Sequence, residues 1–270
     1  MEFYGVLGEK LGHSLSPRIH KMIFEIVGIE GAYKLFEVPR KDLSLFADSM
    51  KVLGIKGANV TIPYKEEIMQ YLDVISPEAQ ALGAVNTIVL RDEKLWGFNT
   101  DYYGFGYLLD RYKVNLKEKE VVILGFGGAA KSILQYLLDS TAKSIYVVSR
   151  SKNKVINSKD KRVQLITYED LKAIDGDILI NTTPVGMFPK DEACPVEEEV
   201  IERFSTVIDT IYNPGMTQLL SKAEALNKRI IGGLYMLIGQ GVRAQELWHD
   251  IAIDESVIKD IYEILNREFS

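Results

Sequence analysis

The chain has 270 residues, which is enough for one large domain or two of ordinary size. Its hydrophobic fraction of 47% and charged fraction of 26% are typical of a globular protein and exclude a disordered or fibrous chain. With 38 acidic against 32 basic residues the formal net charge is -6, which argues against a nucleic acid or an anionic membrane as partner.

The cysteine content and the N-terminus point to the cytoplasm. Cys194 is the only cysteine, so no intrachain disulfide can form, as is usual in a reducing compartment. Residues 1–4 lack the basic and apolar regions of a signal peptide, and the apolar stretch 121–130 is too short to span a bilayer. We therefore expect a soluble cytoplasmic protein.

Short β-branched runs alternate with longer amphipathic stretches, and this alternation predicts an α/β fold. Ser16 is expected to cap the first helix, with Pro17 as its first helical residue. A second helix is expected over residues 41–53, and Pro63 is expected to start a third. Strands are expected over residues 3–7, 33–38 and 57–61, and over 84–90 and 95–98 as a hairpin.

The second half of the chain continues the alternation. After a helix over residues 101–112, a strand at 121–124, a helix at 129–138 and a strand at 144–148 complete a βαβ unit. No strand follows the last predicted helix, which is therefore expected to pack back on the first half and make the first domain discontinuous. The remaining strands are expected at 163–167, 178–181, 207–209 and 229–231, and the closing helices at 236–248 and 255–267.

A glycine-rich segment at residues 125–130, GFGGAA, follows the buried strand and opens a helix. Glycines there let the backbone approach a pyrophosphate, and the helix N-terminus favours its charge. The next strand ends in residues 149–154, SRSKNK, which contain three cations and no acid. An NAD site usually has an acidic residue at this place, whereas cations suit the 2′-phosphate of NADP. The alternatives are a turn without a ligand and a solvated basic helix start.

Five further segments carry polar residues at element ends: HSLSP at 13–17, NVTIPYK at 59–65, GAVNT at 83–87, GFNTD at 97–101 and GLYMLIGQ at 233–240. Two hydroxyls beside a helix N-terminus suit a carboxylate. Lys65 is expected in the first turn of a helix, where the positive end of the helix dipole disfavours a cation. That position would make Lys65 a better proton donor. Taken singly, Ser16 and Asp101 could be helix caps, and Lys65 and Gln240 surface residues.

In this order the segments strongly resemble the shikimate dehydrogenase family, together with NTTPVGM at 181–187 and DTIYNP at 209–214. The resemblance covers nearly the whole chain. It implies a discontinuous α/β substrate domain (1–102 plus 238–270) and a Rossmann-type doubly wound dinucleotide-binding domain (103–237), with the active site in the cleft between them. It also implies an oxidoreductase of chorismate and aromatic amino acid biosynthesis that reversibly reduces 3-dehydroshikimate with NADPH, as a monomer or a homodimer.

The resemblance also assigns residues to roles. Lys65 and Asp101 form the catalytic pair. The substrate-binding residues are Ser14, Ser16, Asn59, Thr61, Asn86, Tyr212 and Gln240. The cofactor-binding residues are Gly125, Gly127, Gly128, Ala129, Ser149, Arg150, Ser151, Lys154, Thr182, Met187 and Gly233.

Other functions fit the sequence less well. An NAD-using quinate/shikimate dehydrogenase would need an acidic residue near position 149, and a methylenetetrahydrofolate dehydrogenase has no evident use for Ser14 and Ser16. A metabolite-sensing homologue without activity would be expected to lose Lys65 or Asp101, although these two could also form a structural salt bridge. A metal enzyme is disfavoured, since His13, His20 and His249 show no ligand spacing with carboxylates.

Overall fold

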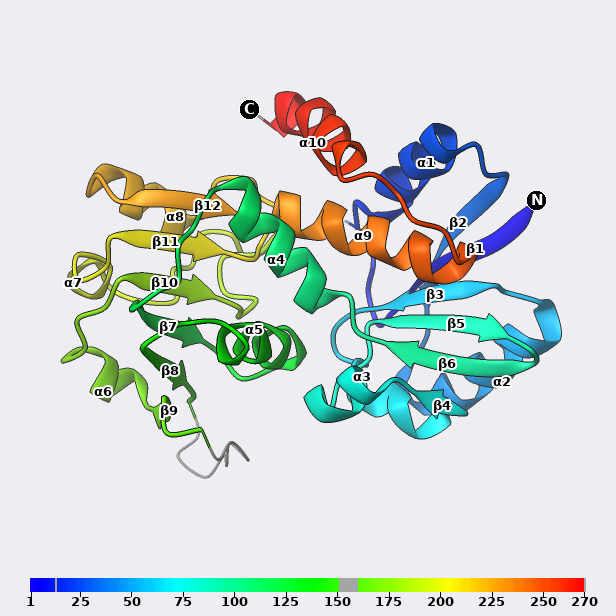
Figure 1. Ribbon diagram of the computed structural model, residues 1–270, viewed down its shortest axis with the longest axis horizontal. Helices are drawn as coiled ribbons and strands as arrows, with labels where there is room; N and C mark the ends of the chain where they lie inside the picture. Colours follow the sequence, from blue (N-terminus) through cyan, green and yellow to red (C-terminus); the bar gives the residue numbers. More distant parts are fainter. Residues whose placement is uncertain (13, 151–159, 270) are drawn as a thin grey trace. The chain divides into compact units, whose positions relative to one another are not determined.

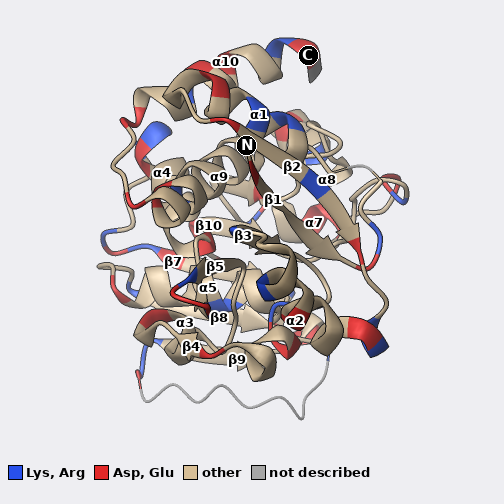
Figure 2. Cartoon of the chain, turned by 90° about the vertical axis from the view of Figure 1, so that its right-hand side faces the viewer, with Lys and Arg blue, Asp and Glu red and all other residues tan. Residues whose placement is uncertain are grey.

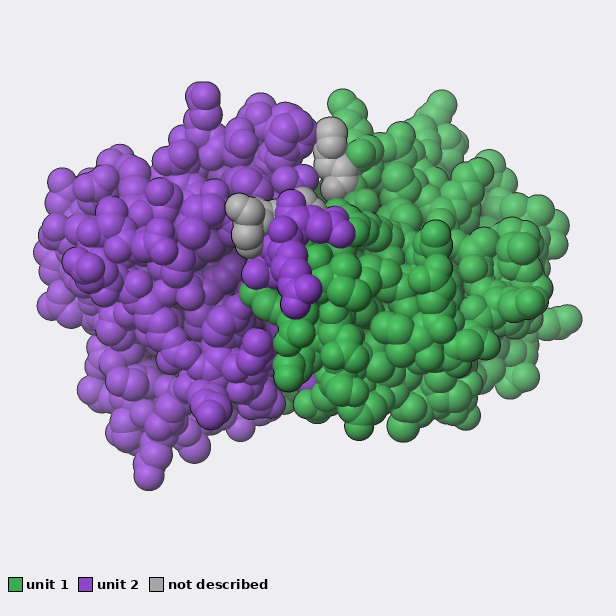
Figure 3. Space-filling view, turned by 90° about the horizontal axis from the view of Figure 1, so that it is seen from above, with its two compact units in different colours: residues 1–104, 238–265 green, residues 105–237, 266–270 purple. Residues whose placement is uncertain are grey.

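The computed structural model describes residues 1–12, 14–150 and 160–269. The chain divides into two compact units, which Figure 3 shows in separate colours: Met1–Gly104 with Ile238–Leu265, and Phe105–Leu237 with Asn266–Ser270. The predicted first domain ended at 102 and included the whole C-terminal segment, whereas here the last residues group with the second unit. The amphipathic pattern of the closing helix indicates that one of its faces is buried. The pattern does not indicate which unit buries that face.

A mixed six-stranded sheet with the order β2-β1-β3-β5-β6-β4 forms the first unit. Parallel pairing joins β1 to β2 and to β3, and antiparallel pairing joins β3, β5 and β6. Asp92 and Glu93 connect the predicted hairpin with φ angles of 50 and 59, as a two-residue turn of the primed type requires. The strands are β1 (Glu2–Gly8), β2 (Gly31–Glu37), β3 (Gly57–Val60), β4 (Val74–Ile75), β5 (Thr87–Arg91) and β6 (Lys94–Phe98).

The two faces of this sheet carry different cores. Leu7 packs in a cluster with Met50 of α2, whereas Tyr4, which points to the opposite face, packs with Trp248 of α9. A Cβ on Gly57 would lie 2.2 Å from Trp248 Nε1, so only glycine lets α9 approach the sheet here. The helices that begin in this unit are α1 (Ser16–Val27), α2 (Leu43–Leu53), α3 (Pro77–Leu82), α4 (Asp101–Arg111) and α10 (Ser256–Phe269), while α9 (Leu234–His249) enters it; 3-10 helices span Arg40–Asp42 and Glu67–Tyr71.

Two predictions at helix starts were wrong. Ser16 is the first residue of α1 and not its N-cap, which is Leu15 and makes no side-chain cap. No helix starts at Pro63: the chain turns, and the helical residues begin only with the 3-10 helix at Glu67. The Lys65 carbonyl accepts a hydrogen bond from the distant Val85 N–H (2.7 Å), and this tertiary bond holds the segment in a turn. Lys65 therefore does not experience the helix dipole that the sequence suggested.

The second unit is a fully parallel sheet with the order β12-β11-β10-β7-β8-β9 (Figure 1). The order reverses between β7 and β10, and ligands of doubly wound sheets bind at the carboxyl ends of strands at such a point. This confirms the predicted fold class. The strands are β7 (Glu120–Leu124), β8 (Ser144–Val148), β9 (Val163–Ile166), β10 (Ile178–Asn181), β11 (Thr206–Asp209) and β12 (Arg229–Gly232); the helices are α5 (Gly128–Leu138), α6 (Tyr168–Leu171), α7 (Glu198–Ile201) and α8 (Gln218–Ala225).

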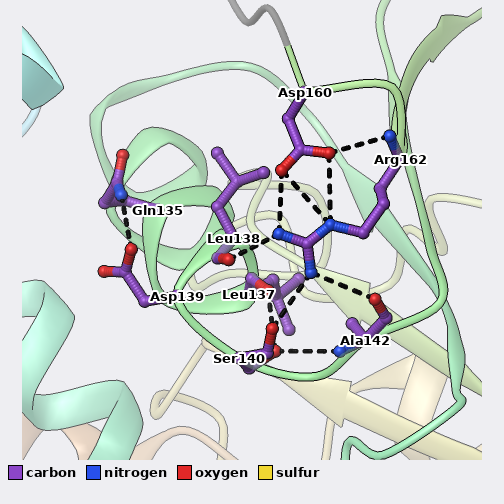
Figure 4. Close-up of polar contacts among 8 residues, drawn as sticks. All are labelled: Gln135, Leu137, Leu138, Asp139, Ser140, Ala142, Asp160 and Arg162. Carbon is purple, nitrogen blue, oxygen red and sulfur yellow. Dashed lines mark hydrogen bonds and ion pairs between the residues drawn. The ribbon is translucent and has the colours of Figure 1, made fainter.

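Arg162 closes the carboxyl end of α5 (Figure 4). Its guanidinium donates to the carbonyls of Leu138 (2.6 Å), Ser140 (3.0 Å) and Ala142 (3.1 Å), and it pairs with Asp160 at 2.8 Å. These carbonyls lie at and beyond the last turn of the helix, where intrahelical donors have run out. One side chain thus ties the entry of β9 to the end of α5.

Charges of both signs are interspersed along the ribbons in Figure 2, and many are paired across elements, such as Lys51 with Asp73 at 2.7 Å. The Leu95 N–H and the Lys51 ammonium lower the pKa of Asp73. Among the described residues, none of the helices combines the length and the apolar composition that crossing a bilayer requires.

Candidate active site

Lys65 and Asp101 form an ion pair in the first unit. Lys65 Nζ lies 2.6 Å from Asp101 Oδ2, and the two side chains are 13% and 2% exposed. Lys65 belongs to the turn after β3, whereas Asp101 is the first residue of α4. An ammonium that a carboxylate orients, with part of its surface accessible, can donate a proton to a reacting oxygen.

Asn86 directs its amide oxygen into the unit. That oxygen accepts hydrogen bonds from the Thr100 N–H (2.7 Å), the Thr100 hydroxyl (3.2 Å) and the Thr87 hydroxyl (3.1 Å). Asn86 is 4% exposed, and both threonines are fully buried. Within the described part of the chain, the Asn86 amide nitrogen donates no hydrogen bond, so it is the end available to a ligand.

The backbone around residues 84–86 connects both members of the ion pair. Asn99 accepts from the Asp101 N–H (3.0 Å) and donates to the Ala84 carbonyl (3.0 Å). The Val85 N–H in turn binds the Lys65 carbonyl at 2.7 Å. Lys65, Asp101 and Asn86, which the sequence places far apart, are thus held in one cluster.

The other residues predicted to contact substrate lie at the edges of elements. Ser14 and Ser16 are half-buried at the start of α1, where the Ser14 hydroxyl accepts the Ser16 N–H at 3.3 Å. Thr61 directly follows β3 and Gln240 lies on α9, both half-buried. Asn59 differs from these, since its oxygen accepts from the Tyr33 hydroxyl (2.7 Å) and its nitrogen donates to Thr87 (3.3 Å). Tyr212 belongs to the second unit.

The glycine-rich turn of the second unit joins β7 to α5. Gly125 has a φ of +103, and a Cβ there would meet Thr183 Cγ2 at 2.9 Å. A Cβ on Gly127 would meet nothing within 4 Å, and this exposed residue precedes α5 without a side-chain cap. Gly128 and Ala129 form the first turn of α5. The uncapped helix start and the open space beside Gly127 fit the pyrophosphate of a dinucleotide.

The end of β8 carries the predicted cations. Ser149 is 6% exposed and its N–H binds the Ile166 carbonyl (3.0 Å), while Arg150 is exposed. Burial raises the pKa of Tyr168, and the charge of Arg150 acts to lower it. Ser151 and Lys154 lie outside the described residues.

The loops after β10 and β11 share a buried carboxylate. Asp209 accepts from the Asn181 amide (3.1 Å), the Ile211 N–H (3.0 Å) and the Thr217 hydroxyl (2.8 Å). Burial nevertheless raises the pKa of Asp209 to about 6. Thr182 is one of the predicted cofactor-binding residues, and its hydroxyl donates to the Leu124 carbonyl at the end of β7 (2.7 Å).

Met187 and Gly233 complete the predicted cofactor residues. Met187 is 40% exposed, and a Cβ on Gly233 would lie 2.2 Å from the Thr210 carbonyl oxygen, so this glycine is required by packing. Sequence reasoning gave no role to Thr87, Thr100, Asn99 or Asp209, although all four lie within the segments it singled out. Their burial, the signal that distinguishes them, is not visible in a single sequence.

Among the described residues, no group of three or more histidine, cysteine, aspartate or glutamate side chains is placed to hold a metal ion. The polar cluster of the first unit consists of an ammonium, a carboxylate and amides. The second unit presents glycines, the Thr182 hydroxyl and the Arg150 guanidinium.

The chain is similar to known proteins along its whole length. Residues 6–88 match the model of the shikimate dehydrogenase substrate binding domain. The chain is 50% identical over the full length of both to a shikimate dehydrogenase (NADP(+)) of Clostridium beijerinckii. It resembles the crystal structure of shikimate dehydrogenase 1 from Peptoclostridium difficile with a TM-score of 0.93 and 48% identity, covering 100% and 99% of the chains. Against the Thermus thermophilus enzyme in complex with NADP(H) and shikimate, the TM-score is 0.83 at 31% identity, with 96% and 98% covered.

Proposed function

The chain belongs to the shikimate dehydrogenase family, and on that premise we propose that it catalyses the reversible reduction of 3-dehydroshikimate to shikimate with NADPH. One observation supports this most directly: the Lys65–Asp101 pair, 2.6 Å apart, is joined through the 84–86 backbone to an asparagine whose amide nitrogen is available to a ligand. A purely structural salt bridge would not need such a neighbour. The enzyme would act in the cytoplasm, in aromatic amino acid biosynthesis, as a monomer or a homodimer.

The first unit is proposed to hold the substrate. The half-buried hydroxyls of Ser14 and Ser16 lie at the start of α1, where the helix dipole favours a carboxylate. Thr61, Asn86 and Gln240 would bind ring hydroxyls. Tyr212 of the second unit stays a predicted contact to the substrate carboxylate.

The second unit is proposed to hold NADP. Gly125, Gly127, Gly128 and Ala129 would face the pyrophosphate at the start of α5, and Arg150 the 2′-phosphate, which a guanidinium can bind with two parallel hydrogen bonds. Thr182, Met187 and Gly233 would line the nicotinamide side. Ser149, Ser151 and Lys154 complete the expected adenosine contacts. When bound, the cofactor supplies the hydride.

Lys65 is proposed to serve the oxygen of the reacting ketone. Negative charge develops on that oxygen during reduction, and the Lys65 ammonium would stabilise it and then release a proton from Nζ. Asp101 would hold Nζ at 2.6 Å throughout and bind the neighbouring hydroxyl. In the direction of oxidation, the same nitrogen would take the proton back.

The test is the loss of NADPH absorbance with 3-dehydroshikimate, with NADH and dehydroquinate run in parallel. Two results together would support the proposal. NADPH is consumed only when 3-dehydroshikimate is present, and the Lys65→Met variant has a kcat about 100-fold or more lower with little change in KM. Equal rates with NADH would favour the dual-specificity quinate/shikimate dehydrogenase. A folded protein that binds NADPH but consumes none with any substrate would favour the metabolite-sensing homologue.

A further inference from the structure

Buried polar side chains continue from Asn86 to the far side of the first unit. Gln245 is fully buried, and its amide contacts two histidine rings, with Nε2 2.8 Å from His20 Nδ1 and Oε1 3.0 Å from His249 Nε2. His20, 2% exposed, stacks on the Tyr33 ring at 4.2 Å and 8°. The catalytic proposal uses none of these groups. They lie on α9, α1 and β2 (Figure 1), and all of these residues belong to the first unit.

The direction of these hydrogen bonds is set from the inner end. The Thr100 N–H can only donate, so the Asn86 atom that it binds at 2.7 Å is the amide oxygen. An amide oxygen only accepts, and the Thr87 hydroxyl lies 3.1 Å from it and 3.3 Å from the Thr100 hydroxyl, which can be donor or acceptor toward it. With its single proton directed to either of these two oxygens, Thr87 accepts from Asn59, so the 3.3 Å contact is a donation from Asn59 Nδ2.

The same logic continues outward from Asn59. With its nitrogen facing Thr87, its oxygen faces the Tyr33 hydroxyl at 2.7 Å. Interaction with Asn59 acts to raise the pKa of His20, as donation from the His20 ring to this oxygen would. His20 is neutral, because burial lowers its pKa to about 3. A neutral imidazole that donates from Nε2 accepts at Nδ1, where Gln245 Nε2 lies. Gln245 Oε1 then accepts from His249 Nε2, and Glu2, 4.0 Å from His249 Nδ1, is too far to reverse this order.

We propose that His20, Gln245 and Asn59 are positioning residues for the dehydrogenase reaction, forming with Thr87 one chain of hydrogen bonds that all run from His249 toward Asn86. The chain fixes the Asn86 amide with its N–H toward the substrate and holds that amide rigid. This rests on the proposed function for the identity of the substrate. It also reassigns Asn59, which holds Asn86 in place instead of binding a ring hydroxyl itself.

The direction of the chain has a direct signature in the histidine tautomer. The protein contains three histidines, so the ring nitrogens of ¹⁵N-histidine-labelled protein give few signals in a two-bond ¹H–¹⁵N spectrum. The expected result is a neutral His20 at pH 7 with the proton on Nε2 and a bare Nδ1. A proton on Nδ1 would mean that the chain runs the other way, and the inference would be overturned. This measurement does not depend on activity.

Kinetics of isosteric variants test the link to substrate. Gln245→Glu replaces the donor that faces His20 with an acceptor, and so moves the His20 proton to Nδ1. We expect KM for shikimate to rise about tenfold, the worth of one hydrogen bond, with KM for NADP⁺ and kcat nearly unchanged. Ser76→Ala removes an equally internal hydrogen bond, the cap of α3, and is the matched control for stability alone.

A second pair of variants covers the case in which Gln245→Glu does not fold. Thr87→Val removes the bridging hydroxyl at constant size and should raise KM for shikimate, whereas Thr87→Ser should restore it. A folded Thr87→Val enzyme whose KM stays at the wild-type value, with only a lower melting temperature, would contradict the inference while the proposed function stands. Wild-type protein without activity on shikimate would instead contradict the proposed function, whatever the tautomer.

Discussion

The Asp101 side chain is 2% exposed, and its carboxylate lies 2.6 Å from the Lys65 ammonium. Replacing it with asparagine keeps the shape and removes the charge that orients Nζ. We expect Asp101→Asn to lower kcat and raise KM for shikimate together, because the residue would serve both the proton donor and the substrate. Removing one partner of a buried pair should also lower the free energy of unfolding by about 3 kcal/mol. Steady-state kinetics and urea unfolding would measure both; an unchanged KM would remove Asp101 from the binding site.

Residue type and position in the sequence do not separate the role of Asn59 from that of Asn86. The motif NVTIPYK predicts Asn59 and Lys65 as site residues, since ordered polar motifs at strand ends point to one edge of a sheet. It did not distinguish Asn59, which is bonded to Tyr33 and Thr87, from Asn86, whose nitrogen is available. Both are asparagines at strand ends, and only the tertiary neighbours separate their roles.

At the scale of one element, the turn before α5 offers two glycines with opposite constraints. Gly125→Ala would strain a backbone at φ +103 and push a Cβ to 2.9 Å from Thr183, so it should destabilise the second unit. Gly127→Ala meets only open space and should fold normally. Because the added methyl would occupy the proposed pyrophosphate position, Gly127→Ala should raise the Kd for NADPH about tenfold or more. Titration of NADPH fluorescence would measure this, and wild-type affinity in Gly127→Ala would move the cofactor elsewhere.

The carboxyl end of the same helix depends on Arg162. Three carbonyls lose their donor in Arg162→Met, and Arg162→Lys, a point charge without the planar fork, can replace only part of these bonds. We expect Arg162→Met to lower the free energy of unfolding by about 1–3 kcal/mol, with Arg162→Lys intermediate. Lys143→Met, which breaks an exposed pair with Glu120, is the control and should change little. Equal stability of all three variants would show that solvent replaces Arg162.

Elements were predictable where local pattern and tertiary environment agree. The parallel strands of the second unit were found to within a residue or two, because strands buried on both faces read as continuous apolar runs. The helix expected at Pro63 was wrong because the Val85 N–H, twenty residues on in the chain, captures the Lys65 carbonyl. Short elements such as β4 and α3 were not predicted, since Val74–Ile75 and Pro77–Leu82 are too brief for a periodic signal.

Across the whole molecule, burial shifts the pKa of a group in each unit within the range between pH 3 and 7, and the two shifts act in opposite directions. Burial lowers the pKa of His20, in the first unit, from 6.5 to about 3. Its contribution to stability is therefore complete above pH 6.5 and is lost as the pH falls toward 3. Burial raises the pKa of Asp209, in the second unit, from 3.8 to about 6, so its contribution is complete below pH 3.8 and is lost as the pH rises through 6.

Between about pH 4.5 and 6.5, acidification should therefore lower the stability of the first unit through His20 and raise the stability of the second unit through Asp209. The lowered pKa of His249 acts in the same direction as His20, and the lowered pKa values of Asp73 and Asp177 act only below this window. Hydrogen exchange at pH 5 and pH 7, corrected for intrinsic rates, should show protection falling in β1, β2 and α1 at low pH and holding or rising in β10 and β11. Asp209→Asn should abolish the rise at pH 5 in the second unit and leave the first unit unchanged. A similar loss of protection in both units would mean that they unfold as one cooperative body. The destabilising effect of His20 at low pH would then outweigh the stabilising effect of Asp209.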